Sequence, residues 1–127
     1  MAYGLKNDRL AVKMLFRPGS TAFWPDPDVS GPYPMWLREI AEVAAERPTS
    51  CLEITGHTSP TGPAALNERL SLLRAEYVKS RLENVRPELA QRTITNGVGS
   101  REMIIGTGRD DITDVLDRRV EFKSISC

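Results

Sequence analysis

The sequence lacks the features that several classes of protein require. It has no excess of charge, because 17 Lys and Arg residues balance 17 Asp and Glu residues. Nucleic-acid-binding domains are usually basic, so we expect no nucleic-acid partner. No apolar run reaches the length of a transmembrane helix, and no charged-then-apolar segment opens the sequence as a signal peptide would. The 127 residues therefore favour a single globular domain that buries a core of its own.

Metal-ligating residues are equally scarce. The sequence holds two cysteines, Cys51 and Cys127, and one histidine, His57. A structural zinc site takes four ligands, usually at close spacing, so these residues predict no metal site. The Gly-x-Gly fragments at 97–99 and 106–108 do not stand between a strand and a helix as nucleotide-binding loops do, and we expect no cofactor. Composition leaves the two cysteines either free or paired with each other.

The pattern of apolar residues predicts four strands and two helices. Their order is a strand over 10–16, a helix over 35–48, a strand over 50–57, a helix over 63–83, and strands over 92–98 and 118–126. This β-α-β-α-β-β order predicts an α/β sandwich, with two main helices on one face of a mixed four-stranded sheet. We expect residues 1–9 to be a flexible N-terminal segment and the proline-rich residues 17–34 to be a loop insertion.

The helix predicted over 63–83 carries apolar and polar residues on neighbouring sides. The expected buried stripe consists of Leu66, Leu70, Leu73, Tyr77, Val78 and Leu82. Beside it, Asn67, Ser71 and Arg74 form a polar line within a sector of about 60°. This line is either a solvated face or part of an anion site. It begins near the helix N-terminus, where free N–H groups together with Arg74 would suit a ligand carboxylate.

The segment "GHTSPTGPAALNERLSLLRAEYVKSRL", residues 56–82, resembles the signature of OmpA-like domains. The matching residues are Gly56, His57, Thr58, Gly62, Asn67, Leu70, Ser71, Arg74, Ala75, Val78 and Leu82. Further segments are similar to the family's first strand ("VKMLFRPGSTAF"), its Gly-x-Gly turn ("GVGS") and its last strand ("DRRVEF"). The resemblance therefore extends over nearly the whole chain from Ala11.

The resemblance implies a binding domain that is not an enzyme. OmpA-like domains of the Gram-negative envelope hold the diaminopimelate side chain of the peptidoglycan stem peptide non-covalently. The motif Arg pairs with the ligand carboxylate, and Arg74 stands at its position. Asn67 would orient the loop or the ligand, and Thr58 would offer backbone or hydroxyl contacts. Arg118 or Arg119 would lie near the pocket, with the other on the opposite face of the strand, unless both form surface ion pairs.

The sequence departs from the family pattern at Ser59, which stands where the motif has an Asp that pairs with the ligand ammonium. A hydroxyl accepts a hydrogen bond but brings no charge, so affinity would fall by about ten- to a hundred-fold. Asp26 and Asp28 in the proline-rich loop would compensate only if that loop reaches the pocket. The domain would therefore bind peptidoglycan weakly or bind a differently charged stem peptide.

The alternative is a degenerate OmpA-like domain that acts as a protein-interaction module in an envelope or secretion assembly. Ser59 favours this hypothesis, and so would an exposed aromatic patch. The candidate patch residues are Phe23, Trp24, Tyr33 and Trp36.

His57, two residues before Ser59, also suggests a base beside a nucleophile. However, Gly56 and Pro60 indicate that the chain is already turning there, and no acid is evidently placed to orient the imidazole. The family also keeps this histidine without catalysis, so we expect no enzymatic activity.

The resemblance also bears on the cysteines and on location. The family fold places the second and fourth strands side by side and antiparallel, which would bring Cys51 and Cys127 within disulfide distance. An oxidising periplasm would favour the bond. Otherwise Cys51 is a small buried hydrophobe and Cys127 lies at a frayed end. The resemblance implies a periplasmic domain of an outer-membrane or envelope-associated protein.

Overall fold

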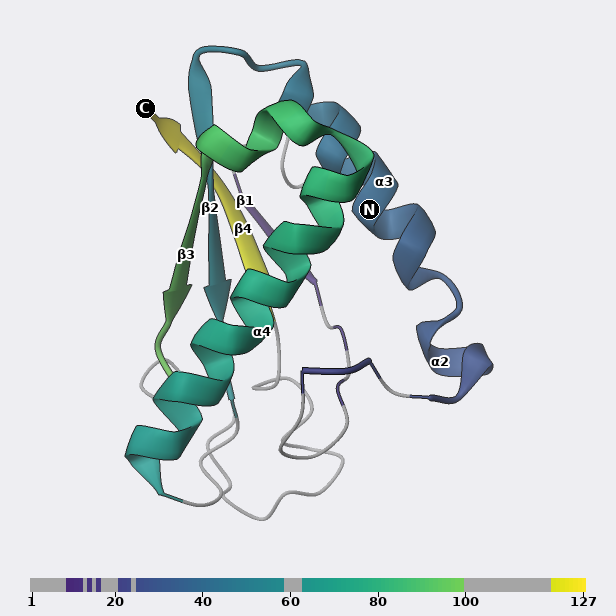
Figure 1. Cartoon of the computed structure of the whole chain (residues 1–127), viewed down its shortest axis with the longest axis vertical. Helices are drawn as coiled ribbons and strands as arrows, with labels where there is room; N and C mark the ends of the chain where they lie inside the picture. The colour runs from purple at the N-terminus through teal and green to yellow at the C-terminus, as the bar shows by residue number, and fades with distance from the viewer. Residues whose placement is uncertain are drawn as a thin grey trace.

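The computed structural model describes residues 9–12, 14, 16, 21–23, 25–58, 63–99 and 120–127. Within these residues the chain forms a mixed α/β fold in which helices cover a β-sheet (Figure 1). The N-terminal segment expected to be flexible lies outside the described residues, apart from Arg9, which begins the first strand. None of the described helices combines the length and the apolar character needed to cross a membrane.

The sheet has the strand order β1-β4-β2-β3. Its strands are β1 (Arg9–Val12), β2 (Ser50–Gly56), β3 (Thr93–Gly97) and β4 (Val120–Ser126). β4 pairs antiparallel with both β1 and β2, whereas β2 and β3 run parallel. The sheet is therefore mixed, and β2 lies beside β4 in the antiparallel arrangement that the family resemblance implies.

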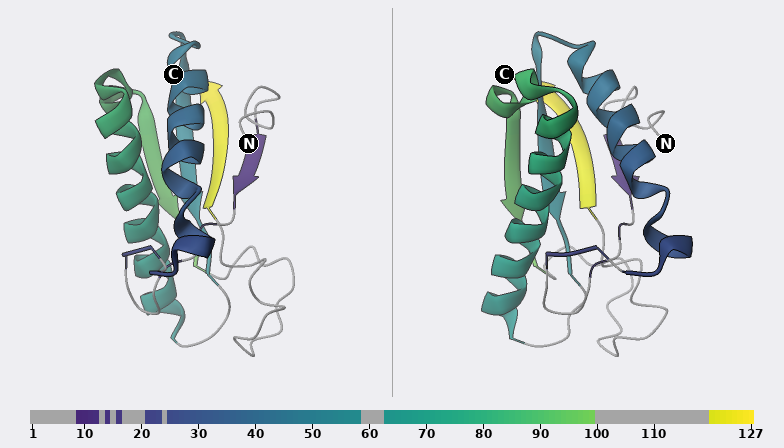
Figure 2. Two further views of the ribbon diagram at one scale, coloured as in Figure 1. Left: turned by 90° about the vertical axis from the view of Figure 1, so that its right-hand side faces the viewer. Right: turned by 45° about the vertical axis from the view of Figure 1, so that its right-hand side comes forward.

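Two long helices, α3 (Tyr33–Ala45) and α4 (Ala64–Val85), pack side by side on the same face of the sheet (Figure 2). The 3₁₀ helix η1 (Pro87–Gln91) connects α4 to β3. The main core lies between the helices and the sheet. It includes Leu37, Ile40, Ala41 and Ala44 of α3, at the spacing predicted, together with Leu52, Ile54, Val78, Leu82, Val120 and Phe122.

The prediction of a loop over 17–34 is wrong in its second half. Residues Pro27–Ser30 form a short helix, α2, and α3 begins at Tyr33. The side chain of Asp26 caps α2 by accepting a 2.9 Å hydrogen bond from the backbone N–H of Asp28. Proline is a loop signal in most positions, but it is favoured in the first turn of a helix, and both α2 and α3 carry one there.

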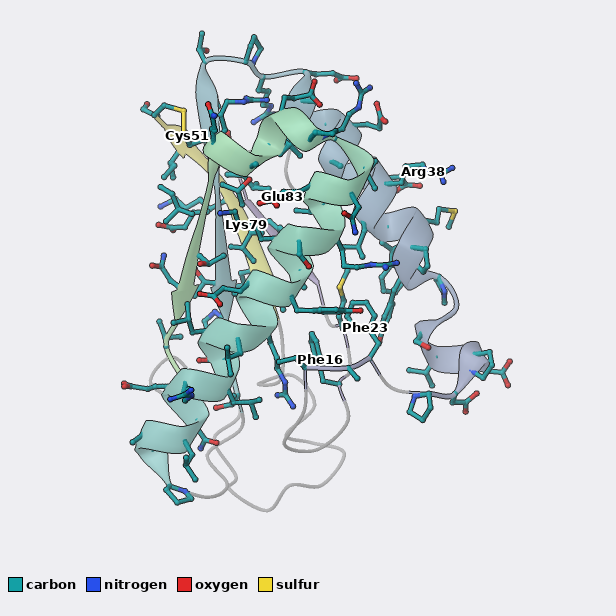
Figure 3. All side chains as sticks on the ribbon, in the orientation of Figure 1. Phe16, Phe23, Arg38, Cys51, Lys79 and Glu83 are labelled. Carbon is teal, nitrogen blue, oxygen red and sulfur yellow. A yellow bond between two sulfur atoms is a disulfide. The ribbon has the colours of Figure 1, made fainter. Side chains whose placement is uncertain are left out.

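A disulfide joins Cys51 in β2 to Cys127 (S–S 2.08 Å, Cα–Cα 5.0 Å; Figure 3). The register of the sheet explains the proximity, because Cys51 stands opposite Ile125 of β4 and Ser50 stands opposite Ser126. The start of β2 and the end of β4 are therefore held together both by the hydrogen bonds of the sheet and by a covalent bond.

Candidate functional site

The polar line of α4 faces the interior of the molecule. Ser71 is fully buried and Arg74 is only 8% exposed, whereas Leu66 is 62% and Leu73 39% exposed. The expected apolar stripe is therefore wrong in the N-terminal half of α4, although Val78 and Leu82 do lie in the core. The solvated-face interpretation of the line does not hold for Ser71 and Arg74.

The close approach of β2 to α4 explains this reversal. β2 ends at Gly56, and a Cβ atom at that position would lie 2.1 Å from the backbone oxygen of Ser71. Where the two backbones come this close, α4 has room only for small side chains such as those of Ser71 and Ala75. Leu66 and Leu73, in the same part of the helix, are exposed instead.

Ser71 connects α4 to the segment that follows β3. Its hydroxyl donates to the backbone oxygen of Glu68 (2.8 Å) and accepts from the backbone N–H of Gly99 (2.9 Å). Gly99 has φ +57°, a conformation that favours glycine. Its carbonyl accepts a 2.8 Å hydrogen bond from the N–H of Thr58, just beyond β2. The chain after β2, the chain after β3 and the N-terminal half of α4 are thus joined at one place.

Arg74 lies beside this junction and against aromatic side chains. Its guanidinium carbon is 4.9 Å from the centre of the Phe16 ring, a cation–π distance. Phe16 in turn packs against Phe23 (5.1 Å) and Tyr77 (6.3 Å between ring centres). Figure 3 shows Phe16 and Phe23 next to α4. A guanidinium buried to this extent has lost most of its hydration, so a carboxylate that reaches it would gain strong, charge-assisted hydrogen bonds.

The expected exposed aromatic patch is not present among the described residues. Tyr33 is 2% exposed, and Phe23 and Trp36 pack against the core. Phe23 contacts both Tyr33 and Tyr77 edge to face, at 5.0 and 5.1 Å. Trp24 lies outside the described residues. These rings are interior packing, which removes one of the two observations that favoured a protein-interaction module.

His57 is buried at the end of β2, and its Nε2 lies 3.6 Å from a carboxylate oxygen of Glu121. No acid was evident from the sequence at this place, so sequence reasoning missed Glu121. The available signal was the pairing of β2 with β4, which sets Thr55 opposite Glu121 and so places His57 within reach. Thr58 is buried as well, and its hydroxyl has no hydrogen-bond partner among the described residues.

The remaining predicted site residues fall into two sets. Ser59, Arg118 and Arg119 lie outside the described residues. Asp26 and Asp28 are exposed on the short helix α2, which lies across the molecule from the N-terminal end of α4 (Figure 1). Compensation of the missing anion by either carboxylate stays a prediction, because Ser59 lies outside the described residues.

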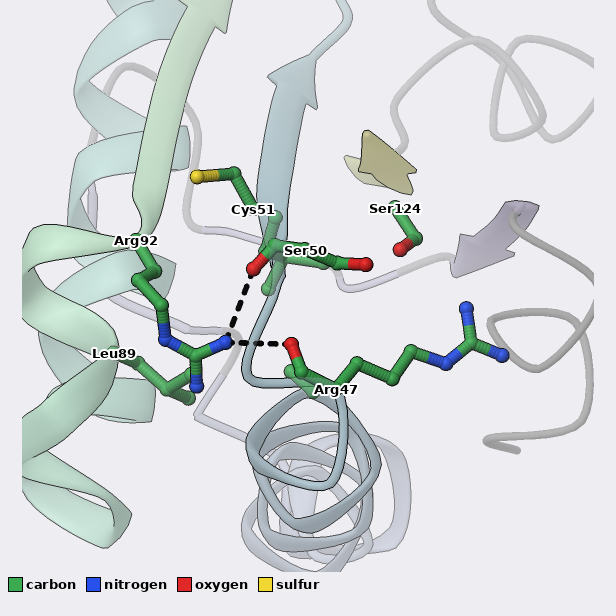
Figure 4. A pocket seen from close by; sticks show the side chains of 8 residues that line it. Arg47, Ser50, Cys51, Leu89, Arg92 and Ser124 are labelled. Carbon is green, nitrogen blue, oxygen red and sulfur yellow. Dashed lines mark hydrogen bonds between the residues drawn. The ribbon is translucent and has the colours of Figure 1, made fainter. Parts of the chain in front are cut away.

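A separate hollow lies at the opposite end of β2, beside the disulfide (Figure 4). Its lining includes Arg47, Ser50, Cys51 and Arg92. One guanidinium nitrogen of Arg92 donates to the backbone oxygens of Arg47 (2.8 Å) and Ser50 (3.0 Å). Arg92 thereby fastens the α3–β2 connection to the start of β3, which is a structural role.

The chain matches a known family. The model described as "OmpA family" matches residues 15–112. The outer membrane protein Omp38 of Acinetobacter baumannii is 43% identical over 70 residues, which are 55% of this chain and 20% of Omp38. The chain thus spans about a fifth of the length of that relative.

Two solved structures share the fold. The peptidoglycan-associated lipoprotein from Burkholderia pseudomallei superposes with a TM-score of 0.72 and 20% identity, covering 90% of this chain and 88% of that one. The periplasmic domain of Helicobacter pylori MotB gives a TM-score of 0.73 and 17% identity, covering 93% and 81%. At these identities the similarity shows the fold alone.

Proposed function

The chain belongs to the OmpA family, and on that premise we propose that this domain binds peptidoglycan non-covalently, through the diaminopimelate side chain of the stem peptide. It thereby anchors an envelope protein to the cell wall from the periplasm. The names of the relatives support this general role, since one is an outer membrane protein, one a peptidoglycan-associated lipoprotein and one a periplasmic domain. The proposal assigns no catalytic step, metal or cofactor to the domain.

The burial of Arg74 is the observation that carries the proposal. An arginine on the inward face of α4, 8% exposed and set against the Phe16 ring, has a fixed position. A guanidinium held in this way keeps its orientation, so binding a carboxylate would cost little side-chain freedom. Asn67 lies two turns towards the N-terminus on the same side of the helix and would orient the ligand.

The ammonium group of the ligand would be held less firmly. Ser59 would accept a hydrogen bond from it, with Thr58 and Arg118 completing the surroundings of the ligand. Because Ser59 carries no charge where the family motif has an Asp, we propose that this domain binds more weakly than a family member with the full motif. The binding free energy would then rest mainly on the carboxylate contact at Arg74.

The experiment compares sedimentation of the purified domain with isolated sacculi for the wild type, Arg74→Ala and Arg38→Ala. Arg38 is an exposed arginine on α3 and serves as the matched control, since its loss removes the same charge far from the site. We expect Arg74→Ala to weaken binding by about ten- to a hundred-fold, the worth of a hydrogen bond to a charged group. Arg38→Ala should bind as the wild type does.

Arg74 is buried, so its removal also affects packing. Urea unfolding of each variant separates loss of binding from loss of fold. Arg74→Lys is a second probe, because it keeps the charge but not the planar pair of donors. Wild-type protein that fails to sediment with sacculi, or folded Arg74→Ala that sediments equally well, would contradict the proposal.

A further inference from the structure

His57 lies between two residues whose backbones are fastened to the chain just after β3. The carbonyl oxygen of Gly56 accepts a 3.2 Å hydrogen bond from the N–H of Val98. The N–H of Thr58, one of the predicted ligand residues, donates to the carbonyl oxygen of Gly99 at 2.8 Å. The backbone on both sides of His57 is therefore held to one neighbouring segment, and the His57 side chain connects this place to a second one.

The second segment is β4. His57 lies two residues beyond Thr55, and Thr55 stands opposite Glu121 of β4, which sets the imidazole diagonally across from that carboxylate. Nε2 of His57 is 3.6 Å from a carboxylate oxygen of Glu121. The His57 side chain is 1% exposed and the Glu121 side chain 18% exposed. Because both groups are largely removed from water, dissolved salt screens their attraction only weakly.

Other charged residues on the elements around His57 lie further along the sheet or on its other face. Those of the described strands, apart from Glu121, are Glu53 of β2, Lys123 of β4 and Arg9 of β1. Lys123 stands opposite Glu53, two positions along β4 from Glu121. At the end of β2, the charged residues that approach from the helix side are Glu68, next to Gly99, and the buried Arg74. Glu121 is the charged group that the structure places at ion-pair distance from the imidazole.

Protonation of His57 would change the strength of this contact. A neutral imidazole at 3.6 Å gains little from a carboxylate, because that distance is too long for an N–H···O hydrogen bond. An imidazolium carries a full positive charge, and opposite charges in a water-poor site attract more strongly than in bulk water. Histidine is also the side chain that ordinarily changes its charge between about pH 5 and pH 8. Mild acid can therefore convert the contact from a weak one to a strong one.

We propose that His57 and Glu121 are positioning residues for the ligand site, and that protonation of His57 strengthens ligand binding. The charged pair fixes the backbone next to Thr58, and with it the hydrogen-bonded junction that Ser71 forms beside Arg74. A site whose parts are already fixed loses less conformational freedom when a ligand binds. This proposal rests on the proposed function, because it concerns the affinity of that same site.

The test measures sedimentation with isolated sacculi between about pH 5 and pH 8 for the wild type, Glu121→Gln and His57→Gln. The affinity of the wild type should rise about five-fold as His57 becomes protonated, which is the lower end of a typical coupling between two sites. His57 is the only histidine in the sequence, so the NMR signals of its ring identify the pH interval of its protonation. The affinity should change over that same interval, and neither variant should show the rise.

Glu53→Gln is the matched control, because it removes a carboxylate from β2 that stands opposite Lys123 and not beside the imidazole. It should keep the pH dependence of the wild type, and any titration of the sacculi themselves affects all variants alike. Circular dichroism and urea unfolding confirm that each variant is folded. Glu121→Gln is the less disruptive of the two test variants, since Glu121 is partly exposed.

Hydrogen exchange of the Thr58 and Gly99 amides tests the positioning without any ligand. Protonation of His57 should raise the protection factors of both amides in the wild type but not in Glu121→Gln. Sacculus binding by the wild type that is equally strong at every pH, or that changes with pH in Glu121→Gln as well, would overturn this proposal and leave the proposed function standing. Absence of binding at every pH would instead overturn the proposed function. Protection factors that do not respond to protonation would show that the pair does not fix the junction.

Discussion

At the scale of single residues, the proposed ligand site combines a fixed cation with a neutral residue where its family carries an anion. Arg74 is held by burial and by the Phe16 ring. By the family resemblance Ser59 would stand at the position of the motif Asp, and its hydroxyl has no charge to offer an ammonium group. Such a site would select its ligand through the ligand carboxylate. It would tolerate different groups in the place of the ligand ammonium.

Ser59→Asp should restore the missing anion. We expect it to raise the affinity for sacculi by about ten- to a hundred-fold, because a hydrogen bond to a charged partner is stronger than one to a neutral hydroxyl. Ser59→Asn is the control, since it has nearly the same shape as Asp without the charge. Titration of labelled domain against sacculi measures the effect. Equal gains for Asp and Asn would mean that shape, and not charge, limits binding.

The sequence identified part of this residue-scale picture and missed another part. The spacing of Asn67, Ser71 and Arg74 placed them on one side of a helix, because residues four and seven apart must lie together. Glu121 could not be found in this way. Its proximity to His57 depends on how β4 pairs with β2, and local periodicity contains no information on the pairing of distant strands.

At the scale of secondary-structure elements, α4 shows why hydrophobicity alone does not identify the buried side. Leu66, Leu70 and Leu73 form the more apolar face, yet the interior receives Ser71 and Arg74. The deciding factor is the distance between backbones at Gly56, which excludes large side chains there. The existence and length of α4 were therefore predictable, whereas its rotation about its own axis was not.

An ion pair between α3 and the residue after α4 predicts how the stability of the fold depends on pH. Arg86, just after α4, donates through Nε to Glu42 of α3 (3.1 Å) and through Nη2 to the other carboxylate oxygen. The hydrogen bond from Arg86 holds the pKa of Glu42 below its usual 4.5. A lowered pKa in the folded state means that the stabilisation is present above the unfolded-state pKa and is lost as pH falls through the folded-state pKa.

Glu42→Gln should therefore lower the midpoint of urea unfolding modestly at neutral pH, because exposed ion pairs contribute little. The difference between wild type and variant should shrink as the pH falls below about 4.5, the usual value for this carboxyl. Glu83→Gln is the control, since it breaks the longer Lys79–Glu83 contact (3.7 Å) within α4 alone (Figure 3). A gap between wild type and Glu42→Gln that stays constant with pH would contradict this assignment.

At the scale of the whole molecule, the class of fold could be predicted from the alternation of strand-like and helical segments. The order of strands in the sheet could not, because β4 inserts between β1 and β2 from more than sixty residues away in sequence. Only the family resemblance pointed to β2 and β4 as neighbours. The same resemblance implied that Cys51 and Cys127 lie close enough to form a disulfide.

The disulfide closes a loop with a sequence separation of 76 residues. On a chain-entropy model such a link stabilises the folded state by about 4 kcal/mol, and measured values are often smaller. Dithiothreitol should therefore lower the urea midpoint of the wild type, and the double variant Cys51→Ser/Cys127→Ser should match the reduced protein. As the control, the urea midpoint of the double variant should not change when dithiothreitol is added. Two reactive thiols in denatured, unreduced wild type would show that the bond is absent.

The central position of β4 has a consequence for the order in which the molecule can assemble. A chain emerging from a ribosome, or entering a compartment through a narrow channel, presents β1 and β2 long before residues 120–126. β1 pairs only with β4 among the described strands, and β2 lacks its antiparallel neighbour until β4 arrives. The complete sheet can therefore form only after residues 120–126 have been delivered.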